Sequence, residues 1–227
     1  MDYSPLEKKI RLKFKDRDLL ENLFVHRSYL NECRTPGLES NERLEFLGDA
    51  VLELVVTEYL YKNYPNDEGE LTNWRSALVK GANLAKVAKA IELGQYLQLS
   101  RGEEKSGGRS KDYILANTVE ALIGAMYLDA GYEAASTFIN DFILVSLEEI
   151  LKAGEHIDAK SRLQEVAQDK KEVTPHYQVE SEEGPDHDKV FTMGVYFGEQ
   201  KITTGEGSSK QKAEQDAARA ALQKMGW

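Results

Sequence analysis

Three acidic side chains crowd one side of the stretch NERLEFLGDAVLELVV, residues 41 to 56. Apolar residues recur there three and four positions apart, which predicts a helix. At about 100° per residue, Glu45 lies roughly 60° and Asp49 roughly 20° from Glu42, so the three share one narrow arc. Such an arc is either the solvated face of an amphipathic helix or a set of oxygen ligands for a metal ion.

Two details weigh against a merely solvated face. Glu45 with Asp49, and Asp49 with Glu53, are like-charge pairs four residues apart, which cost about a few tenths of a kcal/mol each. Phe46 lies beside the acids and outside the apolar stripe, which consists of Leu44, Leu47, Val51, Leu54 and Val55. The spacing alone leaves both interpretations open.

A second group of polar side chains interrupts the apolar stretch 114–128, where Asn117, Thr118 and Glu120 are the only strongly polar residues. A helix that is apolar on every side is normally buried, and a buried carboxylate is costly unless it is paired. Asn117 and Glu120 share one face, which Gly124 continues, and a glycine there would let another helix approach closely. Glu120 is therefore either satisfied by a core Arg or backbone donors, or part of a site.

Taken together, the two helices would offer several carboxylates and an amide oxygen, without His or Cys. These hard oxygen donors suit Mg²⁺ or Mn²⁺ rather than zinc. A cation of this kind typically orients phosphate oxygens and activates water for in-line attack.

The elements that would position these residues fall into two parts. Residues 6 to 152 read almost entirely as helix, and turn signals such as NYPNDEG and SRGEEKSGGRSKD separate the runs. The tail reads as helix, three strands and helix, from KSRLQEVAQDKK through PHYQVESEEG, KVFTMGVYFG and QKITTGEG to SSKQKAEQDAARAALQKM. We predict an all-α domain at 1–153, a linker at 154–157 and a small α+β (α-β-β-β-α) domain at 158–227.

Composition and charge narrow the class of protein. The 227 residues carry a net charge of −10, of which −3 falls on residues 157–227, so any basic patch must be local. Proteins that bind nucleic acids are usually basic, but a metal-dependent nuclease must also concentrate carboxylates at its centre. No apolar run approaches the roughly 20 residues that span a bilayer, and the N-terminal stretch lacks the apolar core of a signal peptide. With Cys33 as the single cysteine, we expect a cytoplasmic protein without membrane contact.

The stretch 41–56 resembles the signature helix of the ribonuclease III enzymes almost letter for letter. HRSYLNE before it, RGEEKSGGRSKDYILANTVEALIGAMYLD after it, and a tail similar to a double-stranded RNA-binding domain extend the resemblance over essentially the whole chain. The resemblance implies a Mg²⁺-dependent endonuclease, with Mn²⁺ as a substitute, that cuts both strands of double-stranded RNA. Products would carry 5′-phosphate and 3′-hydroxyl ends with short 3′ overhangs, and substrates would include rRNA precursors and mRNA.

By motif position, the resemblance implies that Glu45, Asn117 and Glu120 hold the metal ion. It implies that Asp49 and Glu120 are the catalytic residues, closest to the chemistry. The family pattern usually has Leu-Ala-Asp where this chain has Leu-Ala-Asn at 115–117. Asn117 removes one negative charge, so we expect weaker metal binding and slower cleavage.

The resemblance also implies a homodimer in which each subunit cuts one strand. Phe46 would be the aromatic residue that inserts into the partner subunit. Glu42 and, by a weaker correspondence, Glu68 of NDEGEL would belong to a wider acidic cluster.

Three parts of the tail have the chemistry to contact A-form RNA, which such domains read by shape. Gln164 and Glu165 could bond 2′-hydroxyls, and His187, in the loop GPDHDK, could reach a minor groove. The start of the last helix offers free N–H groups and charge to phosphate, at Ser208, Ser209, Lys210 and Lys212. Each feature alone is more often a helix cap or an exposed loop residue. With the acidic balance of the tail, we expect modest, salt-dependent binding.

Two other functions stay open from the sequence. One is a double-stranded RNA-binding protein whose nuclease domain is impaired by Asn117, which would bind duplexes and cut none. The other is a helical scaffold with a protein-binding tail, which would have no affinity for RNA. Cleavage of a duplex, or binding without cleavage, discriminates among the three.

Overall fold

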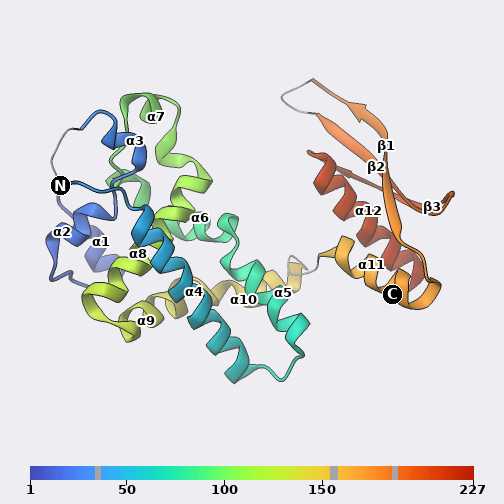
Figure 1. The fold of residues 1–227 in the computed structure, drawn as a ribbon, viewed down its shortest axis with the longest axis horizontal. Coiled ribbons are helices and arrows are strands. Elements are labelled where there is room, and N and C mark those ends of the chain that lie inside the picture. The colour runs from blue at the N-terminus through green and yellow to red at the C-terminus, as the bar shows by residue number, and fades with distance from the viewer. Residues whose placement is uncertain (34–36, 154–157, 186–188) are drawn as a thin grey trace. The chain divides into compact units, whose positions relative to one another are not determined.

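The structure is a computed structural model that describes residues 1–33, 37–153, 158–185 and 189–227. The chain divides into two compact units, Met1–His156 and Ile157–Trp227, each with its own hydrophobic core (Figure 1). The linker predicted at 154–157 lies outside the described residues. The elements of the first unit are α1 (Ser4–Lys9), α2 (Arg17–Asn22), α3 (Arg27–Leu30), α4 (Glu42–Asn63), α5 (Glu68–Val79), α6 (Gly81–Ala90), η1 (Leu93–Tyr96), α7 (Arg101–Lys105), η2 (Gly108–Ser110), α8 (Asp112–Ala130), α9 (Tyr132–Phe142), η3 (Leu144–Ser146) and α10 (Leu147–Ala153).

The first unit is built around its two longest helices, α4 and α8. Leu52 and Val56 of α4 and Leu122 and Ile123 of α8 are completely buried, and α5, α6 and α9 pack around this pair. The prediction that α8 is buried on most sides is confirmed, since eleven of its nineteen residues are buried. Most of its surface is apolar because most of it packs against protein.

Helices predominate in the first unit as predicted. Within its described residues, the one β-type contact is an isolated bridge between Val25 and Gln98. The stretch 100–112, expected to be a plain connection, instead folds into α7 and η2. Ser100 caps α7 by accepting a hydrogen bond from the Glu103 backbone N–H (3.1 Å). The glycines and charged residues of this stretch had indicated a turn rather than a helix.

The second unit has the predicted order of helix, three strands and helix, and that fold is confirmed. Its elements are α11 (Ala159–Lys171), β1 (Pro175–Glu183), β2 (Val190–Phe197), β3 (Gln200–Gly207) and α12 (Lys210–Met225). The strands form an antiparallel sheet in the order β1-β2-β3, and both helices cover one face of it (Figure 1). Val195 and Ile202 of the sheet pack against Leu163, Ala217 and Ala221 of the helices.

Candidate functional site

Helices α4 and α8 touch backbone to backbone at two glycines. A Cβ atom on Gly48 would lie 1.7 Å from the Glu120 carbonyl oxygen, and one on Gly124 would lie 2.2 Å from the Leu44 carbonyl oxygen. No side chain fits at either point. The close approach expected at Gly124 is confirmed, while the sequence reading missed Gly48, its counterpart in LEFLGDAV. This contact brings the polar faces of the two helices together.

The crossing brings Glu45 and Asn117 into direct contact. The Asn117 side-chain amide donates a hydrogen bond to Glu45 Oε1 across 2.8 Å, although the residues are 72 positions apart in the chain. Burial raises the pKa of the Glu45 carboxyl, the Asn117 hydrogen bond opposes this, and the charges of Glu42 and Asp49 reinforce it. The amide therefore stabilises the charged form of a carboxylate that lies among other carboxylates.

Glu120 is the most perturbed acid of the group. Burial raises its pKa from 4.5 to about 7, and the nearby charges of Asp49 and Glu45 act in the same direction. Asp49 itself is exposed on α4. No core Arg pairs with Glu120 among the described residues, so the interpretation of a structurally satisfied carboxylate loses its support. A half-buried carboxylate without a basic partner and with a perturbed pKa is typical of a functional site.

The two residues assigned to the wider cluster lie in different places. Glu42, in the first turn of α4, accepts a hydrogen bond from Ser40 (2.8 Å) and lies 3.6 Å from Arg27. The sequence reading missed Arg27 as its partner, although the residue is part of HRSYLNE. Glu68 starts α5, beyond the far end of α4, about 20 Å along the α4 axis from the turn of Asp49. Within one chain, the structure does not bring Glu68 to the crossing.

The donor atoms at the crossing fit a hard divalent cation in kind. Glu45 and Glu120 supply carboxylate oxygens and Asn117 an amide oxygen. In the part of the chain that the structure describes, no three His, Cys, Asp or Glu side chains converge closely enough to hold a metal ion. The amide at 117, where a third carboxylate could have stood, is one reason.

In the second unit, the predicted RNA contacts are presented to solvent. Gln164 and Glu165 are exposed on α11. His187 lies outside the described residues. Ser209 caps α12 by accepting a hydrogen bond from the Lys212 backbone N–H, and the Lys212 amine reaches the Ser208 hydroxyl at 3.1 Å.

Lys210 differs from Lys212 in its partners. Its amine lies 3.0 Å from the Glu182 carboxylate and 5.7 Å from the centre of the Phe191 ring. The charge of Lys210 is thus directed towards the sheet, while that of Lys212 stays beside the N-terminus of α12.

Comparison with known proteins decides what these two units are. A profile described as ribonuclease-III-like matches residues 16–147, and one described as double-stranded RNA binding motif matches residues 159–225. The chain is 46% identical over 222 residues to ribonuclease 3 of Caldanaerobacter subterraneus, with 97% of each chain covered. It is 45% identical over 217 residues to ribonuclease 3 of Borreliella burgdorferi, covering 95% of this chain and 88% of the relative. The chain belongs to the ribonuclease III family.

A solved structure agrees with this assignment. The nuclease domain of ribonuclease III from Campylobacter jejuni is 42% identical and aligns with a TM-score of 0.58, covering 63% of this chain and 96% of that one. That domain is described as structurally flexible in a region involved in dimer formation. With its relatives named ribonuclease 3 and both domains present, this member of the family is an endoribonuclease of the ribonuclease III type.

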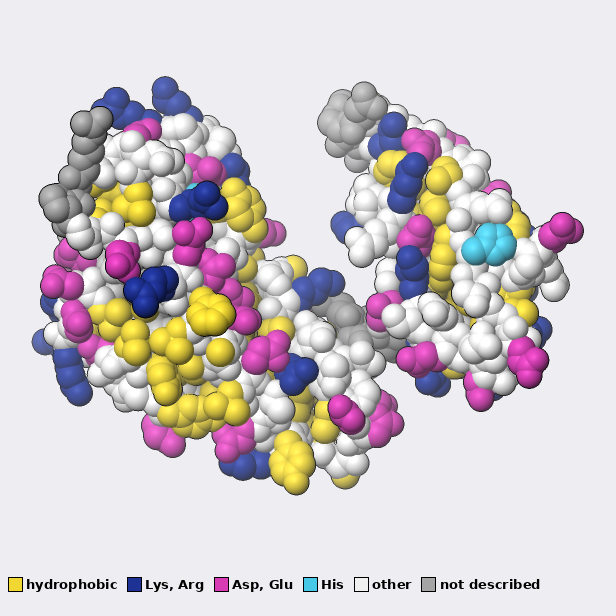
Figure 2. All heavy atoms as spheres, in the orientation of Figure 1, with side chains coloured by type: hydrophobic (Ala, Val, Ile, Leu, Met, Phe, Trp, Pro, Cys, Tyr) yellow, Lys and Arg dark blue, Asp and Glu magenta, His cyan; other side chains and the backbone are white. Residues whose placement is uncertain are grey.

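A second, solvent-exposed row of apolar residues runs along the outer face of α4. Phe46, Leu54 and Tyr61 are 82%, 57% and 79% exposed, and they follow one another seven or eight residues apart. Figure 2 shows the hydrophobic patch over α4. The exposure of Phe46 agrees with its predicted place outside the apolar stripe that faces the core. Leu54 was predicted to belong to that stripe, but it is exposed because it lies at the edge of the stripe.

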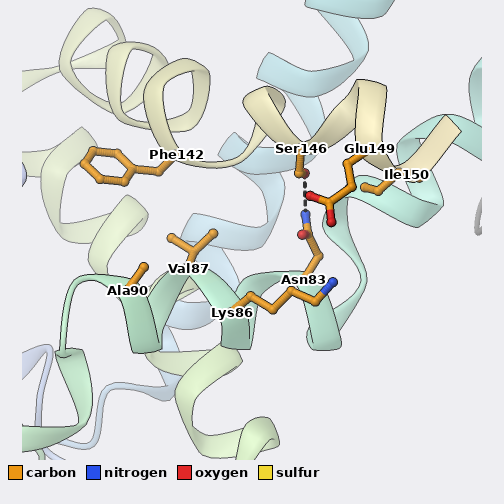
Figure 3. Close-up of a pocket in the computed structure, with 8 residues that line it drawn as sticks. All are labelled: Asn83, Lys86, Val87, Ala90, Phe142, Ser146, Glu149 and Ile150. Carbon is orange, nitrogen blue, oxygen red and sulfur yellow. Dashed lines mark hydrogen bonds between the residues drawn. The ribbon is translucent and has the colours of Figure 1, made fainter. Parts of the chain in front are cut away.

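The first unit also has hollows away from the crossing. A cavity of about 210 Å³ lies between α6, α9 and α10, where Asn83 donates a hydrogen bond to the Ser146 hydroxyl at 3.1 Å (Figure 3). None of the predicted site residues lines it.

The described helices include none that is long and apolar enough to cross a membrane. The α4–α8 crossing is therefore the candidate active site.

Proposed function

We propose that this protein is a Mg²⁺-dependent endoribonuclease that cleaves both strands of double-stranded RNA in the cytoplasm. Its products would carry 5′-phosphate and 3′-hydroxyl ends, and its substrates would be structured RNAs such as rRNA precursors and mRNAs. The observation that carries the proposal is the α4–α8 crossing, which gathers oxygen donors next to a carboxyl whose pKa is about 7. A double-stranded RNA binding motif in the same chain would bind the substrate.

The residues at the crossing divide two roles among them in this proposal. Glu45, Asn117 and Glu120 would hold the cation, with Mn²⁺ as an alternative to Mg²⁺. When bound, the cation supplies charge to phosphate oxygens and lowers the pKa of water. Asp49 and Glu120 lie closest to the chemistry and would accept the proton of the attacking water. The Glu120 carboxyl suits this role because a base works best with a pKa near the working pH, and its pKa is about 7.

Two further contacts complete the proposed enzyme. Phe46 and the exposed stripe of α4 would form the core of a homodimer interface, because a large apolar patch on a soluble protein marks an interaction surface. Gln164, Glu165, His187 and the start of α12 would hold the duplex.

Asn117 tunes the site rather than abolishing it. Its amide donates a hydrogen bond to Glu45, so a cation bound by both side chains must displace this hydrogen bond. The site also lacks the negative charge of the aspartate that the family pattern has there. Both effects lower the affinity for a divalent cation and raise the concentration of Mg²⁺ that cleavage requires.

A duplex-cleavage assay tests the proposal. A long double-stranded RNA is incubated with the protein or with Asn117→Asp across a Mg²⁺ titration, and the products are resolved on a gel with their ends determined. We expect both proteins to cut, with the variant reaching half-maximal rate at about tenfold less Mg²⁺, since one added ligand charge is worth roughly 1 to 2 kcal/mol. Cleavage by neither protein would overturn the proposal. Binding without cleavage by the parent, with cleavage by the variant, would identify an RNA-binding protein instead.

A further inference from the structure

The N-terminal segment concentrates positive charge in an otherwise acidic chain. Residues 8 to 17, KKIRLKFKDR, contain six of the 29 Lys and Arg residues and one of the 39 Asp and Glu residues. Figure 2 shows Lys and Arg side chains along the edge of the first unit that α1 and α2 form. This charge belongs to neither the acidic crossing nor the start of α12, so neither of the roles assigned above accounts for it.

Part of this charge is used by the fold and part is not. Lys9, Arg11 and Arg17 form ion pairs with acids elsewhere in the unit, at Glu92, Asp141 and Glu7. Lys8, Lys13 and Lys15 are exposed and have no ion-pair partner among the residues that the structure describes. Arg11 is itself 81% exposed despite its pair.

The exposed charges are held in a row. Between α1 and α2 the side chains alternate in burial: Leu12 and Phe14 turn inward, while Arg11, Lys13 and Lys15 turn to solvent. We call Arg11, Lys13 and Lys15 the basic row. Beside it, a shallow hollow of about 430 Å³ is lined by Ser4, Glu7, Lys8, Arg11, Leu12 and Lys13.

The basic row is fixed in place by bonds on its inner side. Phe14 is 2% exposed, and its backbone N–H donates to the buried Glu7 carboxylate at 2.9 Å. At the other end, the backbone N–H groups of Lys15 and Asp16 donate to the Asp129 carboxylate. A charged row on a rigid frame loses little conformational entropy when it binds.

One position in the row adopts a costly backbone conformation. Arg11 has φ of +54°, in the left-handed region that glycine or asparagine occupies more easily. A glycine would meet the needs of this turn with less strain. The side chain, rather than the turn, is therefore the feature to be explained.

We propose that the basic row binds the phosphate backbone of double-stranded RNA beyond the part of the duplex at the active site. A line of charges matches a linear polyanion better than a single small anion, and phosphate contacts position a duplex without reading its sequence. The helix α8 sets the separation: Asp129 anchors the row, and Glu120 and Asn117 lie about 14 and 18 Å back along the same helix. This inference rests on the proposed substrate, double-stranded RNA.

Binding measurements on full-length protein test the row. Lys13→Gln with Lys15→Gln is compared with the parent on a duplex of about 16 base pairs, the span of one double-stranded RNA-binding domain, and on one more than twice as long. Divalent cations are omitted so that no cleavage occurs. The control is Lys86→Gln with Lys152→Gln, which removes the same charge from exposed positions of the same unit.

The expected result is specific to duplex length. The row variant binds the long duplex about three- to tenfold more weakly, with a salt slope reduced by about 2 for two lost phosphate contacts, and binds the short duplex like the parent. The control matches the parent on both. Equal behaviour of row variant and control on the long duplex, or an equal loss on both duplexes, would overturn the proposal.

A second variant separates binding from folding. Arg11→Gly relieves the left-handed backbone, so its melting temperature should equal or exceed that of the parent while its affinity for the long duplex falls. A lower melting temperature with unchanged affinity would mean that Arg11 serves the fold through Asp141, which contradicts the proposal. Cleavage of the short duplex in Mg²⁺ reports on the proposed function separately, since it does not require the row.

Discussion

The acidic crossing and the start of α12 place functional side chains in opposite ways. At the crossing, Glu45 and Asn117 are 72 positions apart in the chain, and they meet because Gly48 and Gly124 let the two helix backbones touch. At the start of α12, Ser208, Ser209 and Lys212 are neighbours in sequence, and their contacts with one another are local and exposed.

The difference follows from what each surface has to do. Chemistry on a phosphodiester needs groups held to within a fraction of an ångström, in a partly dry site that perturbs their pKa values. Phosphate binding needs charge near a polyanion, and solvent screens small misplacements. Substitutions at the crossing should therefore have large and mixed effects on stability and activity, whereas those on α12 should have small effects on affinity alone.

Breaking the glycine contact should have the largest effect. Gly48→Ala places a methyl group 1.7 Å from the Glu120 carbonyl oxygen, so α4 and α8 must separate. We expect a loss of at least about 3 kcal/mol in the free energy of unfolding of the first unit, measured by urea denaturation. Cleavage should disappear with it.

The matched control is Gly69→Ala, also in a helix, where the nearest atom to the new Cβ is 3.4 Å away. Its stability should rise by up to about 1 kcal/mol, because alanine favours helix more than glycine. Similar effects of the two substitutions would show that the close crossing is not what holds the site.

Glu120→Gln should separate the frame from the chemistry. Removing this carboxylate should lower the cleavage rate by a factor on the order of 100 or more, measured at saturating Mg²⁺ on a long duplex. The fold should survive, since glutamine has the same shape. Cleavage at an undiminished rate would remove Glu120 from the proposed catalytic set.

The same variant should be more stable than the parent at high pH without metal. Folding raises the pKa of Glu120 to about 7, so its contribution to stability is complete below pH 4.5 and is lost as the pH rises through about 7. Glutamine avoids this loss. In a chelator, Glu120→Gln should gain on the order of 2 kcal/mol at pH 8 and nothing near pH 4, as thermal melts over this range can show.

The outer face of α4 should respond in association rather than in folding. Phe46→Ala removes a ring that is 82% exposed, so the chain alone loses little packing. Self-association should weaken by about 2 kcal/mol, or roughly 30-fold, in sedimentation over a range of concentrations. Val145→Ala, 68% exposed away from the stripe, is the control and should leave association unchanged.

Local patterns predicted much of this molecule, and long-range pairings set the limit. Alternation and turn residues indicated all three strands of the sheet, because those signals lie within each strand. The sequence also pointed to Gly124, but not to its contact with Gly48, because which helices cross is decided by packing. For the same reason, the pairs Arg27–Glu42 and Lys210–Glu182 were not foreseen: each joins elements that meet only in three dimensions.

The smallest expected effect distinguishes the two lysines of α12. Lys210 is paired with Glu182, while Lys212 lies at the first turn of α12 with its amine beside the Ser208 hydroxyl. Lys212→Gln should weaken binding of a short duplex by about 1 kcal/mol and lower the salt slope by about 1. Lys210→Gln should do less than half of that, because its removal also releases Glu182. Fluorescence anisotropy at several salt concentrations measures both. If Lys210→Gln costs as much as Lys212→Gln, then RNA must draw Lys210 away from the sheet, and the surface of α12 is less fixed than its hydrogen bonds indicate.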